Sequence, residues 1–142
     1  MTTVFYIDDD QDDMDLVQWI LADLNQASIV FHNSKDLMLL LENPPPEPSI
    51  IIIDLNMPQH DGIEVLSQIR VLKKFDNIPL VMYSTTASPL KVEQCRRLGA
   101  NLFMVKGRSL DNMVKSFTQL LSVNWKTFKP NDEEFVIDFN KR

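Results

Sequence analysis

Carboxylates follow two short apolar segments of the chain. Three consecutive aspartates, residues 8–10, come after VFYI, and Asp54 ends a run of four isoleucines. Aspartates are favoured at the start of a helix, which accounts well for Asp10, Asp12 and Asp13. A carboxylate that ends an isoleucine run has no such explanation. Asp54 is therefore the strongest candidate for a functional residue.

These carboxylates come together if the two apolar segments are neighbouring parallel strands. Ligands of open parallel sheets bind at the carboxyl ends of the strands. Like charges a few ångströms apart destabilise a fold unless a proton or a cation is present, and carboxylate oxygens are ligands for hard divalent cations. We therefore expect a metal site for Mg²⁺, or Mn²⁺, at this edge.

The same edge carries groups suited to phosphoryl transfer. A strand-end carboxylate such as Asp54 can attack phosphorus and form an aspartyl phosphate. Ser84 and Thr85 end another apolar segment and can donate hydroxyl hydrogen bonds, and Lys106 ends the next one and can pair with a phosphoryl oxygen.

The segments that must position these side chains alternate between strand and helix patterns. Short apolar runs predict five strands, at 4–7, 29–31, 50–53, 80–83 and 102–105. The segments between them have helical apolar spacing; in the first, the stripe is Leu16, Val17, Ile20, Leu21 and Leu24. Repeated strand–helix units predict an α/β fold, a parallel sheet with helices on both faces.

Composition limits the function classes. The 142 residues suit one globular domain, and a net charge of −6 with a pI of about 4.8 argues against direct binding to nucleic acid. We expect no membrane insertion, because no apolar run approaches the roughly 20 residues that a spanning helix needs. A single cysteine, Cys95, and an N-terminus unlike a signal peptide predict a cytoplasmic protein.

Several spaced motifs resemble the receiver domains of bacterial response regulators, over roughly residues 3–123. They are FYIDDD at 5–10, IIIDLNMPQHDG at 51–62, VMYSTT at 81–86 and LGANLFMVK at 98–106. The resemblance implies a doubly wound, flavodoxin-like, five-stranded sheet of order 2-1-3-4-5 in three α/β/α layers. It also implies a role as a phosphoacceptor switch and not as an enzyme.

By this resemblance, Asp54 is the phosphoacceptor. Asp9 is the direct metal ligand together with Asp54, Asp8 is an indirect one, and Asn56 supplies its backbone carbonyl.

The resemblance also assigns the residues that respond to phosphorylation. Ser84 stands for the hydroxyl that turns toward the phosphoryl group, Lys106 for the family's lysine, and Phe103 for the aromatic switch residue. The family usually has a proline in a cis bond after this lysine, whereas this chain has Gly107, for which we expect a trans bond or a looser turn.

The predicted domain organisation is a receiver domain at 1–123 and a C-terminal extension at 124–142, with no output domain. Residues 135–139 could add a strand to a sheet edge, in this chain or in a partner, or cover the last helix. Trp19 lies opposite the apolar stripe of the first helix, where it either marks a partner surface or is covered by the extension.

The leading hypothesis is a stand-alone phosphorylation switch. Its donor would be a sensor histidine kinase or a His-phosphotransfer protein, and its output altered binding to an unknown downstream protein or formation of a homodimer. The alternative is a receiver-like scaffold that is not phosphorylated. A metal-dependent phosphatase is disfavoured, because Asn56 stands where a second acid would be expected.

Overall fold

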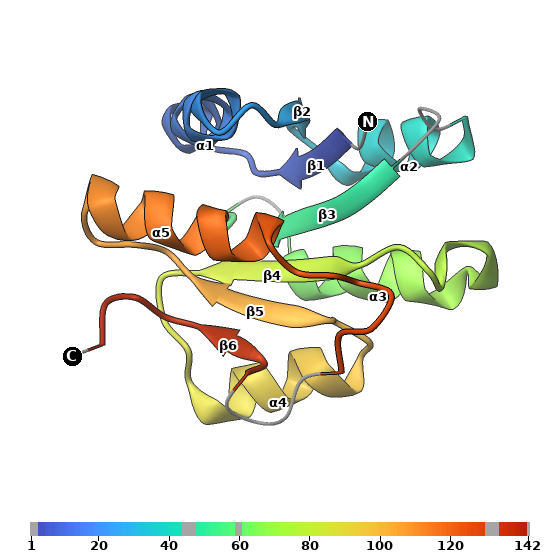
Figure 1. The fold of residues 1–142 in the computed structure, drawn as a ribbon. Coiled ribbons are helices and arrows are strands. Elements are labelled where there is room, and N and C mark those ends of the chain that lie inside the picture. The colour runs from blue at the N-terminus through green and yellow to red at the C-terminus, as the bar shows by residue number, and fades with distance from the viewer. Residues whose placement is uncertain (1–2, 44–47, 59–60, 130–133, 142) are drawn as a thin grey trace.

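The computed structural model describes residues 3–43, 48–58, 61–129 and 134–141, and Figure 1 shows its fold. The strands are β1 (Thr3–Ile7), β2 (Ala27–Phe31), β3 (Pro48–Asp54), β4 (Leu80–Ser84), β5 (Leu102–Val105) and β6 (Val136–Ile137). The helices are α1 (Gln11–Asp23), α2 (Ser34–Glu42), α3 (Gly62–Val71), α4 (Pro89–Arg97) and α5 (Leu110–Leu121), with a 3₁₀ turn, η1 (Lys73–Phe75). None of the described helices is long and apolar enough to cross a membrane.

All strand pairs are parallel, and the order across the sheet is β2-β1-β3-β4-β5-β6. The predicted order 2-1-3-4-5 is confirmed. The chain reverses its direction of winding after β2, so β1 and β3 are neighbours and their carboxyl ends meet at one edge. The prolines at 44–46, which come just before β3 in the sequence, lie outside the described residues.

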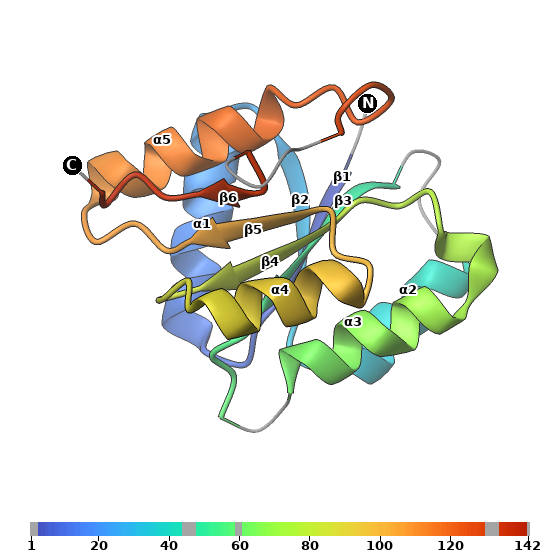
Figure 2. The same cartoon turned by 90° about the horizontal axis from the view of Figure 1, so that it is seen from below.

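The sheet separates two apolar cores, as its alternating side chains require. Figure 2 shows α2, α3 and α4 on one face and α1 and α5 on the other. Phe5, Ile7 and Ile53 point toward the first group of helices, and Tyr6 and Ile52 point toward the second. Because both faces are covered, the central strands are apolar throughout, which is why their sequence shows continuous runs instead of alternation.

One part of the predicted stripe on α1 is wrong. Leu16 is 36% exposed, and Met14 takes its place in the core with Val17, Ile20 and Leu21. The helix packs with its 14–17–21 ridge on the sheet, which turns position 16 toward solvent.

The C-terminal extension adds a strand to the sheet of its own chain. Val136 pairs with Phe103 and Ile137 with Met104, so β6 covers the outer edge of β5. Phe135 is buried in the core under α4, where the Arg96 guanidinium lies 4.3 Å from the centre of its ring, and Ile137 is buried in the core under α5. Of the arrangements that the sequence left open, the structure has strand addition within the chain.

Candidate functional site

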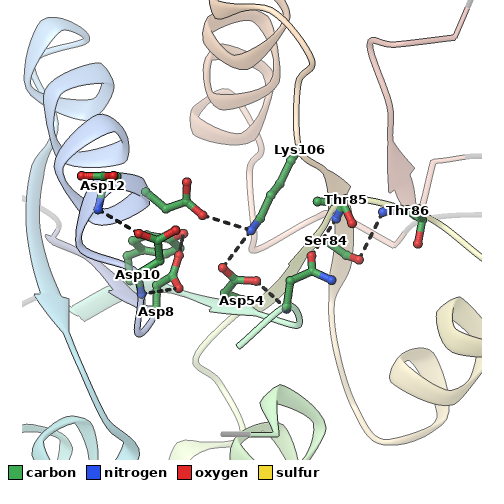
Figure 3. A network of polar contacts seen from close by, with 11 residues as sticks. Asp8, Asp10, Asp12, Asp54, Ser84, Thr85, Thr86 and Lys106 are labelled. Atoms are coloured by element: carbon green, nitrogen blue, oxygen red, sulfur yellow. Dashed lines mark hydrogen bonds and ion pairs between the residues drawn. The ribbon is translucent and has the colours of Figure 1, made fainter. Parts of the chain in front are cut away.

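The candidate site lies where β1, β3, β4 and β5 end, in front of the first turn of α1 (Figure 3). Backbone hydrogen bonds continue past the strand ends, from Leu55 N to Tyr83 O at 2.8 Å and from Lys106 N to Ser84 O at 2.7 Å. They hold the segments that follow β3 and β5 in register with β4.

Asp54 is buried, with 1% of its surface exposed. The backbone N–H of Asn56 donates to its Oδ1 at 2.6 Å, and the Lys106 ammonium donates to its Oδ2 at 2.8 Å. Burial, followed by a hydrogen bond with the Asp8 carboxyl, raises the pKa of Asp54 to about 7, although Lys106 and the Asn56 N–H oppose the shift. A buried carboxyl of this kind gains from a further positive charge.

Asp8 lies beside Asp54 and is also buried. The Tyr6 hydroxyl donates to its Oδ2 at 2.6 Å, and the backbone N–H of Asp10 donates to its Oδ1 at 3.1 Å. Burial and the neighbouring Asp8 carboxylate raise the pKa of Tyr6, so the phenol remains a donor. Tyr6 was not singled out from the sequence, where it reads only as an apolar strand residue.

Lys106 spans the space between these acids. Its Nζ lies 2.8 Å from Asp54 Oδ2, 3.5 Å from Asp13 Oδ2 and 5.3 Å from the centre of the Tyr83 ring. Burial alone would lower the pKa of Lys106, but the hydrogen bond and charge of Asp54 outweigh it and raise the pKa. The ammonium is therefore held charged at the acidic centre.

Asp13 is a second site residue that the sequence analysis missed, because it was read as part of a solvated helix start. Asp8, Asp13 and Asp54 each offer a carboxylate oxygen, and these oxygens lie within 4.8 Å of one another. Partial burial raises the pKa of Asp13. Its position four residues before the buried Val17 places it on the sheet-facing side of the first turn, and that spacing was a usable signal.

A cleft of about 520 Å³ opens over these groups. Its lining residues are Asp9, Asp10, Gln11, Asp13, Asn56, Pro58, Thr85 and Lys106. Carboxylate oxygens gathered at a cleft fit a hard divalent cation. The positive charge of such a cation would also stabilise the ionised form of the buried Asp54, whose pKa stays raised beside Lys106. The same cleft is large enough for a phosphoryl group beside the cation.

Comparison with known proteins identifies the family. The family model described as response regulator receiver domain matches residues 4–118. The chain belongs to the response regulator receiver domain family. The resemblance inferred from the motifs is thereby confirmed.

Individual relatives agree with this assignment. The receiver domain is 28% identical over 119 residues to response regulator Rcp1 of Synechocystis sp., which covers 79% of this chain and 81% of Rcp1. It is 32% identical over 122 residues to chemotaxis protein CheV1 of Helicobacter pylori, covering 82% of this chain and 38% of CheV1. The Mn²⁺-bound form of Rcp1 superposes with a TM-score of 0.73 at 26% identity, covering 91% of this chain and 98% of that one.

Other residues that the sequence analysis named surround the site of this receiver domain. Asp9 and Thr85 line the cleft, and the backbone N–H of Thr85 donates to Asn56 Oδ1 at 2.8 Å. Ser84, which precedes Thr85 in the chain, is buried, and its Oγ accepts from the Thr86 N–H at 3.3 Å.

Two named residues lie away from the acidic centre. Phe103 is fully buried in the core on the α4 side, and its N–H donates to Phe135 O at 2.8 Å, so the C-terminal extension covers its strand. Trp19 is 55% exposed on the outer face of α1.

Gly107 of the receiver domain has a steric role. No cis peptide bond occurs among the described residues, so the Lys106–Gly107 bond is trans, as expected. The turn is not loose, however. A Cβ atom at this position would lie 2.4 Å from Met113 N and 2.7 Å from Asn112 C, both backbone atoms of α5. Glycine is present because α5 packs directly on the loop.

Proposed function

We propose that this chain is a phosphorylation switch that accepts a phosphoryl group on Asp54 from a phosphohistidine, with a divalent cation bound at the acidic cluster. The observation that carries the proposal is the environment of Asp54. A buried carboxyl with a raised pKa lies 2.8 Å from the Lys106 ammonium, and Lys106 lines the acidic cleft. The donor would be a sensor histidine kinase or a His-phosphotransfer protein.

Asp54, Lys106 and Thr85 have different roles in phosphoryl transfer. An Asp54 oxygen forms the bond to phosphorus as the P–N bond of the phosphohistidine breaks, and the imidazole leaves with the electron pair of that bond. The Lys106 ammonium, which holds Asp54 Oδ2, is within reach of a phosphoryl oxygen, where it balances negative charge. The Thr85 N–H is already held by the Asn56 side chain, so this strand end is positioned before the reaction.

The acidic cluster would hold the cation. Asp8, Asp9 and Asp54 offer carboxylates, and Asn56 offers its backbone carbonyl, as in the arrangement that the family resemblance implies. A bound Mg²⁺ or Mn²⁺ supplies charge neutralisation for the incoming phosphoryl oxygens. Mn²⁺ in the related Rcp1 structure supports a divalent ion of this size.

The output would be altered protein binding. Ser84 would turn toward the phosphoryl group, and Phe103, which lies on the neighbouring strand, would repack in response. Self-catalysed phosphorylation and dephosphorylation are the only reactions we assign to the chain, and we infer a cytoplasmic location.

Incubation with acetyl phosphate tests the proposal. We expect intact mass spectrometry to show one added phosphoryl group in the presence of Mg²⁺ and none in chelator. Asp54→Asn should show none under either condition, whereas Asp15→Asn, at an exposed aspartate of α1, should be labelled like the native chain. Absence of labelling in the native chain would contradict the proposal and favour a scaffold that binds partners without phosphorylation.

Labelling of a different residue would contradict the assignment of Asp54. Peptide mapping of the labelled native chain distinguishes this outcome, because the other carboxylates and hydroxyls of the cleft, such as Asp13 and Thr85, lie in segments of the chain far from Asp54. Replacement of Mg²⁺ by Mn²⁺ should preserve labelling, since both ions accept oxygen ligands.

The exposed apolar side chains of α1 are the proposed docking surface for the phosphohistidine donor. Leu16 and Trp19 lie one helical turn apart, 36% and 55% exposed. Leu16 also lines a cavity of about 330 Å³ with Lys106 and Arg108, so this surface reaches the site. A large exposed aromatic such as Trp19 is suited to an interface anchor.

Trp19→Ala should therefore slow transfer from a kinase that phosphorylates the native chain by about tenfold, the effect of losing one anchor worth roughly 1–2 kcal/mol. Its labelling by acetyl phosphate should stay within about twofold of native. Leu39→Ala, at an exposed leucine of α2, is the matched control and should affect neither rate. An equal loss of phosphorylation rate with the kinase and with acetyl phosphate would mean that Trp19 stabilises α1 and has no part in docking.

A further inference from the structure

The end of the chain is fixed against the loop that carries Lys106. β6 is anchored on both faces of the sheet, by Phe135 under α4 and by Ile137 under α5. Three residues further on, Asn140 reaches the β5–α5 loop, and its own N–H donates to Asp138 Oδ1 at 2.9 Å, which fixes the turn that presents it.

The Asn140 side chain uses both ends of its amide on the backbone of this loop. Its Nδ2 donates to Lys106 O at 2.9 Å, and its Oδ1 accepts from Arg108 N at 2.9 Å. Asn112 Nδ2 donates to the same Oδ1 at 3.3 Å. One amide thus bridges the peptide groups on the two sides of Gly107 and joins them to α5.

This bridge lies at a point where the loop needs support. Glycine has the widest backbone freedom, and Gly107 separates the residue that contacts Asp54 from the helix that follows. The Lys106 side chain extends from this backbone to Asp54, so a displaced backbone would move Nζ away from the 2.8 Å contact. Small displacements of a positioned group have large effects on transfer rates.

We propose that Asn140 is a positioning residue for Lys106, and that the C-terminal extension is consequently a structural part of the phosphorylation site. This inference rests on the proposed function of Asp54. The Asn140 amide contacts Lys106 O, Arg108 N and Asn112 Nδ2, so it acts on the reaction through the position of Lys106 and touches no reacting atom.

The test compares single substitutions in the full chain. With acetyl phosphate and Mg²⁺, Asn140→Ala should be phosphorylated about five- to tenfold more slowly than the native chain, the effect expected from losing two hydrogen bonds to backbone. Asn124→Ala removes the same kind of amide just beyond the other end of α5, where its Oδ1 accepts from Lys126 N, and should react at the native rate.

Amide hydrogen exchange supplies a local readout. In Asn140→Ala, the Arg108 amide should exchange at least tenfold faster, because it loses its acceptor, while the Val81 amide in the sheet remains as protected as in the native chain. A general loss of stability would accelerate both amides.

Asn140→Asp separates the two hydrogen bonds. A carboxylate still accepts from Arg108 N but cannot donate to Lys106 O, so the Arg108 amide should stay protected while phosphorylation slows as in the alanine variant. If Asn140→Ala does not fold, the phosphorylation rate of Asn140→Asp tests the positioning role of Asn140 in its place.

The outcomes are distinguishable. Suppose that the native chain and Asn124→Ala are phosphorylated. If the Asn140 variants then react within twofold of the native rate, the positioning role is wrong and the proposed function stands. If the native chain is not labelled, the proposed function fails and this inference with it. If the Arg108 amide is unaffected in Asn140→Ala, the bridge does not hold the loop and the inference is overturned.

Discussion

Asp54→Asn is expected to stabilise the metal-free chain at pH 8 while it abolishes phosphorylation. The folded-state pKa of Asp54, about 7, lies above the ordinary value of 3.8. A group with a raised folded pKa binds its proton more tightly in the native state, so its contribution to stability is complete below pH 4 and is lost as the pH rises through 7. At pH 8 the native chain carries a buried carboxylate that the variant lacks.

The expected gain is roughly 2–4 kcal/mol in the free energy of unfolding at pH 8, from about three pH units at 1.36 kcal/mol each, reduced by the weaker bond that an amide offers Lys106. At pH 4 the variant and the native chain should differ by less than about 1 kcal/mol. Urea unfolding in chelator, followed by tryptophan fluorescence, measures both values.

Asp15→Asn, at an exposed aspartate, controls for the loss of one negative charge and should stay within about 0.5 kcal/mol of native at either pH. Mg²⁺ should stabilise the native chain at pH 8 and have a much smaller effect on Asp54→Asn. Equal stability of native chain and Asp54→Asn at pH 8 would show that Lys106 already compensates the buried charge.

Gly107→Ala has the second large expected effect, a loss of about 3 kcal/mol in the free energy of unfolding. The added methyl would lie 2.4 Å from Met113 N and 2.9 Å from Met113 Cα. Backbone atoms cannot rotate away as a side-chain end does, so α5 must move, although Phe117 and Leu120 hold it in the core. Restoring the proline that the family usually has would place a Cβ in the same space if the bond stayed trans.

Arg108→Ala is the control for Gly107→Ala, because it changes the neighbouring exposed side chain and leaves the backbone N–H that Asn140 accepts. It should stay within about 0.5 kcal/mol of native in urea unfolding. A Gly107→Ala variant as stable as the native chain would mean that the loop and α5 separate easily, and would weaken the case for a rigid Lys106.

The C-terminal extension shows why some contacts cannot be predicted from the sequence. Residues 134–141 hold a strand of only two residues, too short for any periodic signal. Its apolar residues allowed strand addition in this chain or in a partner, or packing over the last helix. Which edge it would pair with depended on the outer edge of β5, a surface that exists only after the rest of the chain has folded.

The sequence by itself determined the parallel α/β sheet and the group of Asp8, Asp54, Ser84 and Lys106 at its edge. Continuous apolar runs give buried strands, and parallel strands bring their ends to one edge, so strand-end residues are placed by topology alone.

Only the tertiary structure decided the roles of Asp13, Gly107 and Asn140. Each depends on a distance between elements far apart in the chain: the rotation of α1 over β1, the depth at which α5 packs on the loop, and the pairing of β6 with β5. Such distances are set by the packing of whole side-chain layers, which local periodicity does not encode.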